Sequence, residues 1–244
     1  MLAFALIALA LASLQGTADP SLFNYDAALP LDVRETNRRE DNGVLLRDVT
    51  YAALTGGNNA ATLISPKTPS AKPAPAILFV HWYGPPAPTS NRTQFIPDAV
   101  ALARQGVTSL LIDTPWSEPK WFPTRKGEED YTRSVQQVRD LRRALDVLLA
   151  QPGIDRTRVA YVGHDFGAMY GTLAAVVDRR VTHFVFMAGT ASFTDWFLYR
   201  PKLEGVAREK FIAQLAPLDP VRWVPKLRGP VLMQFADTDE HVST

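Results

Sequence analysis

The sequence contains no cysteine. A disulfide framework and lipid attachment through a cysteine are therefore excluded. A metal site is not expected either, because the four histidines show no paired ligand spacing. No glycine-rich phosphate-binding loop is present, so the sequence implies no metal and no nucleotide cofactor.

An excess of charge of one sign is also lacking. Lysine and arginine total 26 and aspartate and glutamate total 25, which gives a formal net charge of +1, and no basic cluster stands out. Nucleic acids and membrane surfaces are bound by a concentrated basic face. We therefore expect neither as a partner, and expect a small-molecule substrate that is not selected by bulk charge.

No apolar run is long enough to span a bilayer. The first run, from Leu2 to Leu14, has about 13 residues, whereas a membrane helix needs ~20. Small residues follow it at Gly16 and Ala18, a pattern that fits a cleaved signal peptide over residues 1 to 18, although no lysine or arginine precedes the run. The expected context is a periplasmic or secreted bacterial protein. A buried or disordered N-terminal helix is the alternative.

The apolar content is sufficient for one sizeable core. Of the 244 residues, 46% are hydrophobic, and parallel α/β domains of this length are often undivided. Residues 19 to 43 are polar and predict an irregular, solvated lead-in. A single domain is expected from residue 44 to residue 244.

Strand and helix signals alternate along this domain. Apolar strand signals lie at residues 44 to 53, 60 to 66, 76 to 84, 107 to 113, 158 to 163, 181 to 189 and 230 to 237, and helix signals lie at 93 to 105, 131 to 148 and 167 to 178. The first two strands flank the turn "TGGNN" and predict a hairpin. Continuous apolar strands separated by helices predict an α/β fold, in which a mostly parallel sheet is covered by helices on both faces.

The segment "GHDFG", Gly163 to Gly167, fits the pattern G-x-Nu-x-G of a nucleophile elbow, because it follows a strand and precedes a helix. Its tip is Asp165, where a serine is usual. A carboxylate that attacked an ester carbonyl would form an anhydride, which is a poor intermediate. Attack on a saturated carbon gives an ordinary ester that a histidine-activated water can hydrolyse. The motif predicts Asp165 as a nucleophile that forms a covalent intermediate.

With this motif, the chain from about residue 44 resembles the α/β-hydrolase fold family. The amphipathic helix and the segment "QPGIDRTRVAYVGHDFGAMYG" are most similar to dienelactone-hydrolase-related proteins. The resemblance implies an oxyanion hole formed by the backbone N–H groups of Tyr83, or alternatively Trp82, in "HWYG", and of Phe166. Trp82 stands where the family has a glycine.

The segment "ADTDEHV" is similar to the family's segment that carries the acid of the triad. The resemblance implies that Asp239 orients the catalytic histidine, with Asp237 as a weaker candidate. None of the four histidines stands where the family places its base: they are His81, His164, His183 and His241. The chain is therefore interpreted as an incomplete domain that lacks the final strand, the final helix and the base.

Two further features bear on the reaction. The side chains of His81, Trp116, Trp121 and His164 are expected to line a substrate pocket, since aromatic residues in loops commonly serve binding. "GHD" followed by an aromatic residue is similar to the elbows of epoxide hydrolases and dehalogenases, but residues 190 to 229 leave little room for their helical cap.

The leading hypothesis is thus a hydrolase with epoxide-hydrolase-like or dehalogenase-like chemistry at Asp165. An esterase or lactonase of dienelactone-hydrolase type is one alternative. A non-catalytic hydrolase-like protein, in which Asp165 is a buried turn acid, is the other.

Overall fold

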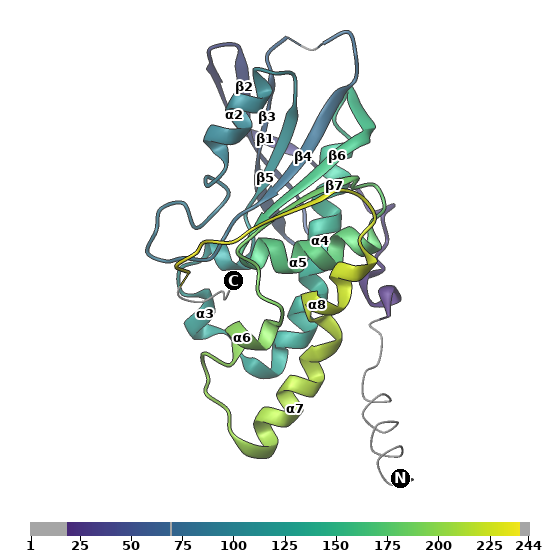
Figure 1. The fold of residues 1–244 in the computed structure, drawn as a ribbon. Coiled ribbons are helices and arrows are strands. Elements are labelled where there is room, and N and C mark those ends of the chain that lie inside the picture. Colours follow the sequence, from purple (N-terminus) through teal and green to yellow (C-terminus); the bar gives the residue numbers. More distant parts are fainter. Residues whose placement is uncertain (1–18, 69, 240–244) are drawn as a thin grey trace.

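The computed structural model describes residues 19–68 and 70–239 (Figure 1). The predicted signal peptide and His241 lie outside the described residues. Within the described part, one sheet has the strand order β1-β2-β3-β5-β4-β6-β7-β8. The strands are β1 (Arg34–Asp41), β2 (Val44–Ala52), β3 (Asn58–Pro66), β4 (Ala74–Val80), β5 (Thr108–Ile112), β6 (Ile154–His164), β7 (His183–Met187) and β8 (Val231–Gln234).

The sheet is mostly parallel, as predicted. Strands β5, β4, β6, β7 and β8 run parallel to one another. The pairs β1–β2, β2–β3 and β3–β5 are antiparallel, and β2 and β3 form the predicted hairpin. The helices are α2 (Ile96–Ala103), α3 (Trp121–Thr124), α4 (Asp130–Leu149), α5 (Phe166–Val177), α6 (Phe193–Phe197), α7 (Gly205–Leu215) and α8 (Pro220–Trp223).

Both faces of the central strands are buried, which explains their continuous apolar sequences. Successive side chains of a strand point to opposite faces. Leu110 and Ile112 of β5 accordingly join the core beneath α4 and α5, whereas Leu111 joins a second core beneath α2. Figure 1 shows α4 and α5 packed together against the sheet. This arrangement confirms the predicted helices on both faces.

The prediction of an irregular lead-in over residues 19 to 43 is wrong in part, because Arg34–Asp41 forms the edge strand β1. All its residues are exposed, so the segment has no apolar alternation from which a strand is recognised. Antiparallel pairing with β2 holds it, and charged side chains of this kind protect a sheet edge from further pairing. Further upstream, the buried Phe23 packs edge-on against Trp223 at 5.5 Å between ring centroids.

The described helices include none that is both long and apolar enough to cross a bilayer. The predicted helix at 131 to 148 is α4, and its apolar side chains face the core. The connection between β7 and β8 contains only α6, α7, α8 and short helical turns. Asp165 directly follows β6, so the elbow projects at the edge of the sheet where the parallel strands end.

Candidate active site

The strand β6 enters α5 through a single residue, Asp165, whose backbone has φ 54° and ψ −117°. This conformation is strained for a residue other than glycine, and it presents the tip side chain at the end of the sheet. The two flanking glycines permit the turn: a Cβ on Gly163 would overlap the carbonyl oxygen of Gly167, and one on Gly167 would overlap that of Val80. The elbow geometry is therefore present with a carboxylic acid at its tip.

The Asp165 carboxyl group lies against the backbone donors named from the sequence. The N–H of Tyr83 donates to Oδ2 at 3.1 Å, and the N–H of Phe166 lies near enough to lower the pKa of the carboxyl group. The other oxygen, Oδ1, is buried and has no hydrogen-bond partner among the described residues. One oxygen of the carboxyl is thus held, and the other is not.

Burial determines the charge of this group. The residue is only 4% exposed. Burial raises the pKa of Asp165 to about 8, against the opposing effect of the Tyr83 and Phe166 N–H groups, and the negative charge of Asp239 raises it further. Asp165 is therefore largely protonated at neutral pH and ionises in mildly alkaline solution.

Trp82 does not contribute its backbone to this arrangement, because its N–H donates to Oε1 of Gln94 at 2.9 Å. Since Oε1 accepts that bond, the Nε2 group of Gln94 is the donor to Nδ1 of His164, at 2.6 Å. The neutral His164 ring thus carries its proton on Nε2. Its imidazole stacks on the Trp82 indole, with 5.5 Å between centroids and an interplanar angle of 8°. Burial lowers the pKa of His164.

The sequence analysis missed Gln94. A single polar residue ahead of a helix carries no signal of its contacts, because His164 lies 70 residues further along the chain. Its amide connects the segment after β4 with the end of β6. Gln94 therefore positions both Trp82 and His164.

His81 is a structural residue of the same edge. It is 1% exposed, its Nδ1 donates to the Trp82 carbonyl at 2.7 Å, and its Nε2 lies within hydrogen-bond distance of the hydroxyls of Thr114 and Ser117, at 2.9 and 2.8 Å. Burial lowers the pKa of His81 to about 4, so the ring is neutral. These bonds join the segment after β4 to the segment after β5.

Trp116 and Trp121 lie on the α4 side of the elbow, and both contact the ring of Phe166, at 5.8 and 5.2 Å between centroids. Trp116 is buried, and its indole N–H donates to the carbonyl of His81. Both indoles line a cavity that does not include Asp165. The predicted aromatic residues thus gather beside the nucleophile elbow, with Phe166 between them and the tip.

Asp239 follows β8, and its charge acts on the pKa values of both His164 and Asp165. The carboxyl ends of β6 and β8 therefore bring these residues to one edge. Asp239 also lines a cavity of about 880 Å³ together with Ala168, Met169 and Gly189. The cavity thus lies between Asp239 and the first turn of α5.

The remaining candidates lie apart from this edge. Asp237 is exposed in the turn after β8, and His183 is exposed at the start of β7, the opposite end of the sheet from the elbow. Among residues 19–68 and 70–239, no group of three or more histidine or acidic side chains is arranged to hold a metal ion.

Comparison with known proteins adds to this geometry. A model of a family described as "Alpha/beta hydrolase family" matches residues 77–242. Polyketide transferase af380 from Aspergillus fumigatus is 26% identical over 149 residues, which are 60% of this chain and 48% of that protein. The chain spans about half the length of the curated relatives it matches.

Two solved structures are also similar. An acetyl xylan esterase from Paenibacillus sp. R4 has a TM-score of 0.67 at 17% identity, covering 96% of this chain and 95% of that chain. A protein from Klebsiella pneumoniae assigned as a dienelactone hydrolase has a TM-score of 0.56 at 17% identity, covering 82% of this chain and 76% of that chain. At such identities the likeness establishes a shared fold.

Proposed function

Because this chain belongs to the α/β hydrolase family, we propose that it is a hydrolase in which Oδ1 of Asp165 attacks a saturated carbon of a small substrate. One observation carries the proposal. Oδ2 accepts the Tyr83 N–H bond at 3.1 Å, whereas the buried Oδ1 has no hydrogen-bond partner among the described residues. The carboxyl is thereby oriented with Oδ2 engaged and Oδ1 without a competing hydrogen bond among the described residues.

In the first step, a lone pair of Oδ1 forms a bond to the substrate carbon while the bond from that carbon to its leaving group breaks. A halide departs as the anion, and an epoxide oxygen remains attached through its other carbon and takes a proton from solvent. The product is an ester of Asp165. Its carbonyl oxygen is Oδ2, which lies at the Tyr83 N–H.

In the second step, water adds to the ester carbonyl carbon, and negative charge develops on Oδ2. Collapse of this tetrahedral intermediate breaks the bond between the carboxyl carbon and Oδ1. The alkyl group leaves with Oδ1 as an alcohol that takes up the proton lost by the water, and the oxygen of the water remains in the Asp165 carboxylate. In the free protein the N–H of Tyr83 donates to Oδ2 and the N–H of Phe166 favours the charged carboxyl group, which supports a role for both groups in stabilising this oxyanion. A base must take the proton of the water, and the described residues place no unengaged histidine beside Asp165. Asp239 supplies the negative charge that would hold such a histidine.

Trapping the ester tests the proposal. The protein is incubated at pH 9, where Asp165 is ionised, with styrene oxide or 1-bromobutane, and digested for mass spectrometry. We expect an adduct on the peptide that contains Asp165, formed faster as pH rises through about 8. The variant Asp165→Asn should give no adduct there, whereas Asp237→Asn, which removes an exposed carboxylate, should retain it.

The burial of Asp165 favours a second candidate, a hydrolase-like protein in which the carboxyl does not react. Ester hydrolysis, for which the acetyl xylan esterase is named, proceeds through an oxyanion, and the N–H donor of Tyr83 is suited to stabilise one. A gain of p-nitrophenyl acetate hydrolysis by Asp165→Ser, with no adduct on the parent at pH 9, would establish this candidate and reject the alkylation proposal.

A further inference from the structure

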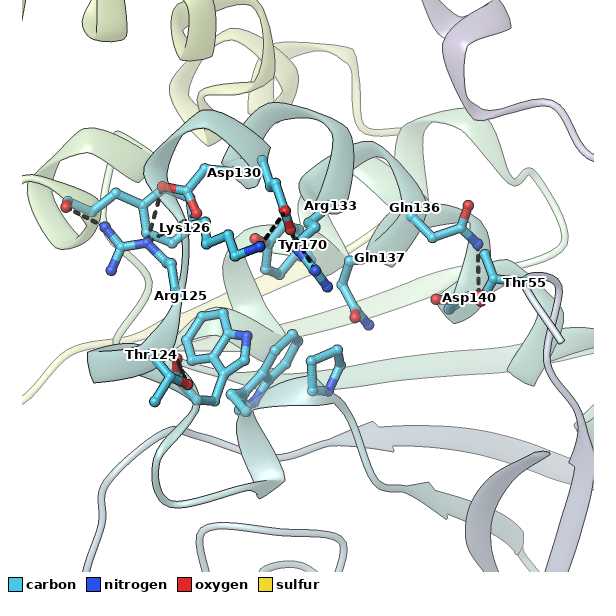
Figure 2. Close-up of a pocket in the computed structure, with 15 residues that line it drawn as sticks. Thr55, Thr124, Arg125, Lys126, Asp130, Arg133, Gln136, Gln137, Asp140 and Tyr170 are labelled. Atoms are coloured by element: carbon cyan, nitrogen blue, oxygen red, sulfur yellow. Dashed lines mark hydrogen bonds and ion pairs between the residues drawn. The ribbon is translucent and has the colours of Figure 1, made fainter. Parts of the chain in front are cut away.

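A second cavity, of about 320 Å³, lies on the α4 side of the elbow (Figure 2). Aromatic side chains form much of its lining: Trp116, Trp121, Tyr170 and Phe197. Polar side chains of α4 face them across the space. Asp165 is not part of the lining, so the cavity is separate from the proposed reaction centre.

Gln137 projects from α4 into this cavity. Figure 2 shows its amide group directed away from the helix, and Trp116 and Trp121 line the same cavity. The residue is only 5% exposed, and its Oε1 is buried with no hydrogen-bond partner among the described residues. A buried amide oxygen without a donor is unfavourable. The cavity therefore presents an unused acceptor.

The same side chain borders a neighbouring cavity of about 290 Å³, and the two cavities share Pro115, Gln137 and Asp140 in their linings. The amide thus lies where the two spaces adjoin. A ligand of moderate size can place a hydrogen-bond donor at Oε1 of Gln137 and its ring system against the aromatic side chains of the lining.

The basic side chains of the lining each form an ion pair, although Nη1 of Arg125 is buried without a hydrogen-bond partner among the described residues. Arg125 bonds Asp130 at 2.9 Å, and Glu129 bonds both Arg133 at 2.5 Å and Lys126 at 3.4 Å (Figure 2). At the far end, a carboxylate oxygen of Asp140 accepts from Gln136 at 3.0 Å. These pairs neutralise the basic groups of the lining, so the cavity carries no excess charge that would select an ionic ligand.

We infer that this cavity binds a neutral, planar aromatic molecule that carries an N–H or O–H donor. The donor bonds Oε1 of Gln137, and the ring packs against Trp116 and Trp121. Aromatic pairs of this kind gain energy beyond the burial of their area. A molecule of the same shape without a donor leaves the buried oxygen unpaired and binds more weakly. The inference does not depend on the reaction proposed for Asp165.

Isothermal titration calorimetry with indole and 1-methylindole tests the inference, because the two probes share a ring system and differ in the N–H donor. The whole chain should bind indole about tenfold or more tightly than 1-methylindole. In Gln137→Leu the two affinities should become equal. Gln136→Leu is the matched control: its amide bonds Asp140, so the preference for indole should persist.

Equal affinities for the two probes in the parent protein, or no binding of either, would overturn the inference, as would a preference for indole that survives in Gln137→Leu. Tighter binding of tryptamine, whose ammonium group is charged, would overturn the neutral class. Near-ultraviolet circular dichroism checks that the variant is folded, and Gln137→Met replaces it if it is not. Adduct formation on Asp165 is a separate measurement, so either proposal can fail without the other.

Discussion

The burial of Asp165 predicts that this one side chain makes folding depend on pH. Its pKa is raised from 3.8 to about 8, chiefly by burial. Above pH 4 the unfolded chain releases a proton that the folded protein retains. The stabilisation that this group provides is therefore complete below its unfolded pKa of 3.8, falls as pH rises, and is lost once pH passes about 8.

The magnitude follows from the size of the shift. From 3.8 to about 8 is a difference of about 4 pH units, each worth about 1.4 kcal/mol, so the free energy of unfolding should fall by roughly 6 kcal/mol across this range. That is a large part of the ~5–15 kcal/mol that stabilises a typical domain. Asparagine has nearly the same shape and does not ionise. Asp165→Asn should therefore become progressively more stable than the parent as pH rises.

Urea unfolding between pH 4 and pH 9, followed by tryptophan fluorescence, measures both proteins. The difference in unfolding free energy between Asp165→Asn and the parent should grow by over 1 kcal/mol per pH unit and level off near pH 8. Asp237→Asn removes an exposed carboxylate and provides the control, with a curve parallel to that of the parent. Parallel curves for Asp165→Asn and the parent would refute the argument that Asp165 is held neutral by burial.

Three other outcomes are expected. Gly167→Ala should lower the unfolding free energy by about 2 kcal/mol or more in thermal or urea melts, because the new Cβ overlaps the β4 backbone; an unchanged melt would contradict the close approach. Gln94→Leu should cost about 1–3 kcal/mol by leaving a backbone N–H unpaired, and should shift the nitrogen-15 resonances of His164; unaltered resonances would argue against the amide contact. Expression in a bacterial host should yield a periplasmic protein that lacks residues 1 to 18 by N-terminal sequencing, whereas an intact N-terminus would refute the signal peptide.

Local patterns in the sequence are sufficient to predict the strands β2 to β8, the helices α2, α4 and α5, and the elbow, but not the short helix α3 or the helices α6, α7 and α8. The strand before Asp165, the helix after it and the two glycines lie within one short segment, so the motif is visible without knowledge of the β4 backbone that Gly167 approaches. The apolar sequence of β5 likewise reports a strand buried on both faces. The edge strand β1 escapes prediction because pairing with β2 holds it, and its own side chains remain exposed.

The chemical state of the site is decided by contacts between segments far apart in the chain. Tyr83, 82 residues before Asp165, supplies the N–H that holds one carboxyl oxygen, and packing around the elbow removes the water that would keep the group ionised. Gln94 and Gln137 acquire their roles in the same way. Gln94 bonds His164 at the end of β6, and Gln137 lines a cavity with aromatic side chains from other segments. Burial and hydrogen bonding are properties of the folded surroundings, so a motif predicts which residue stands at the tip and only the tertiary structure decides its charge.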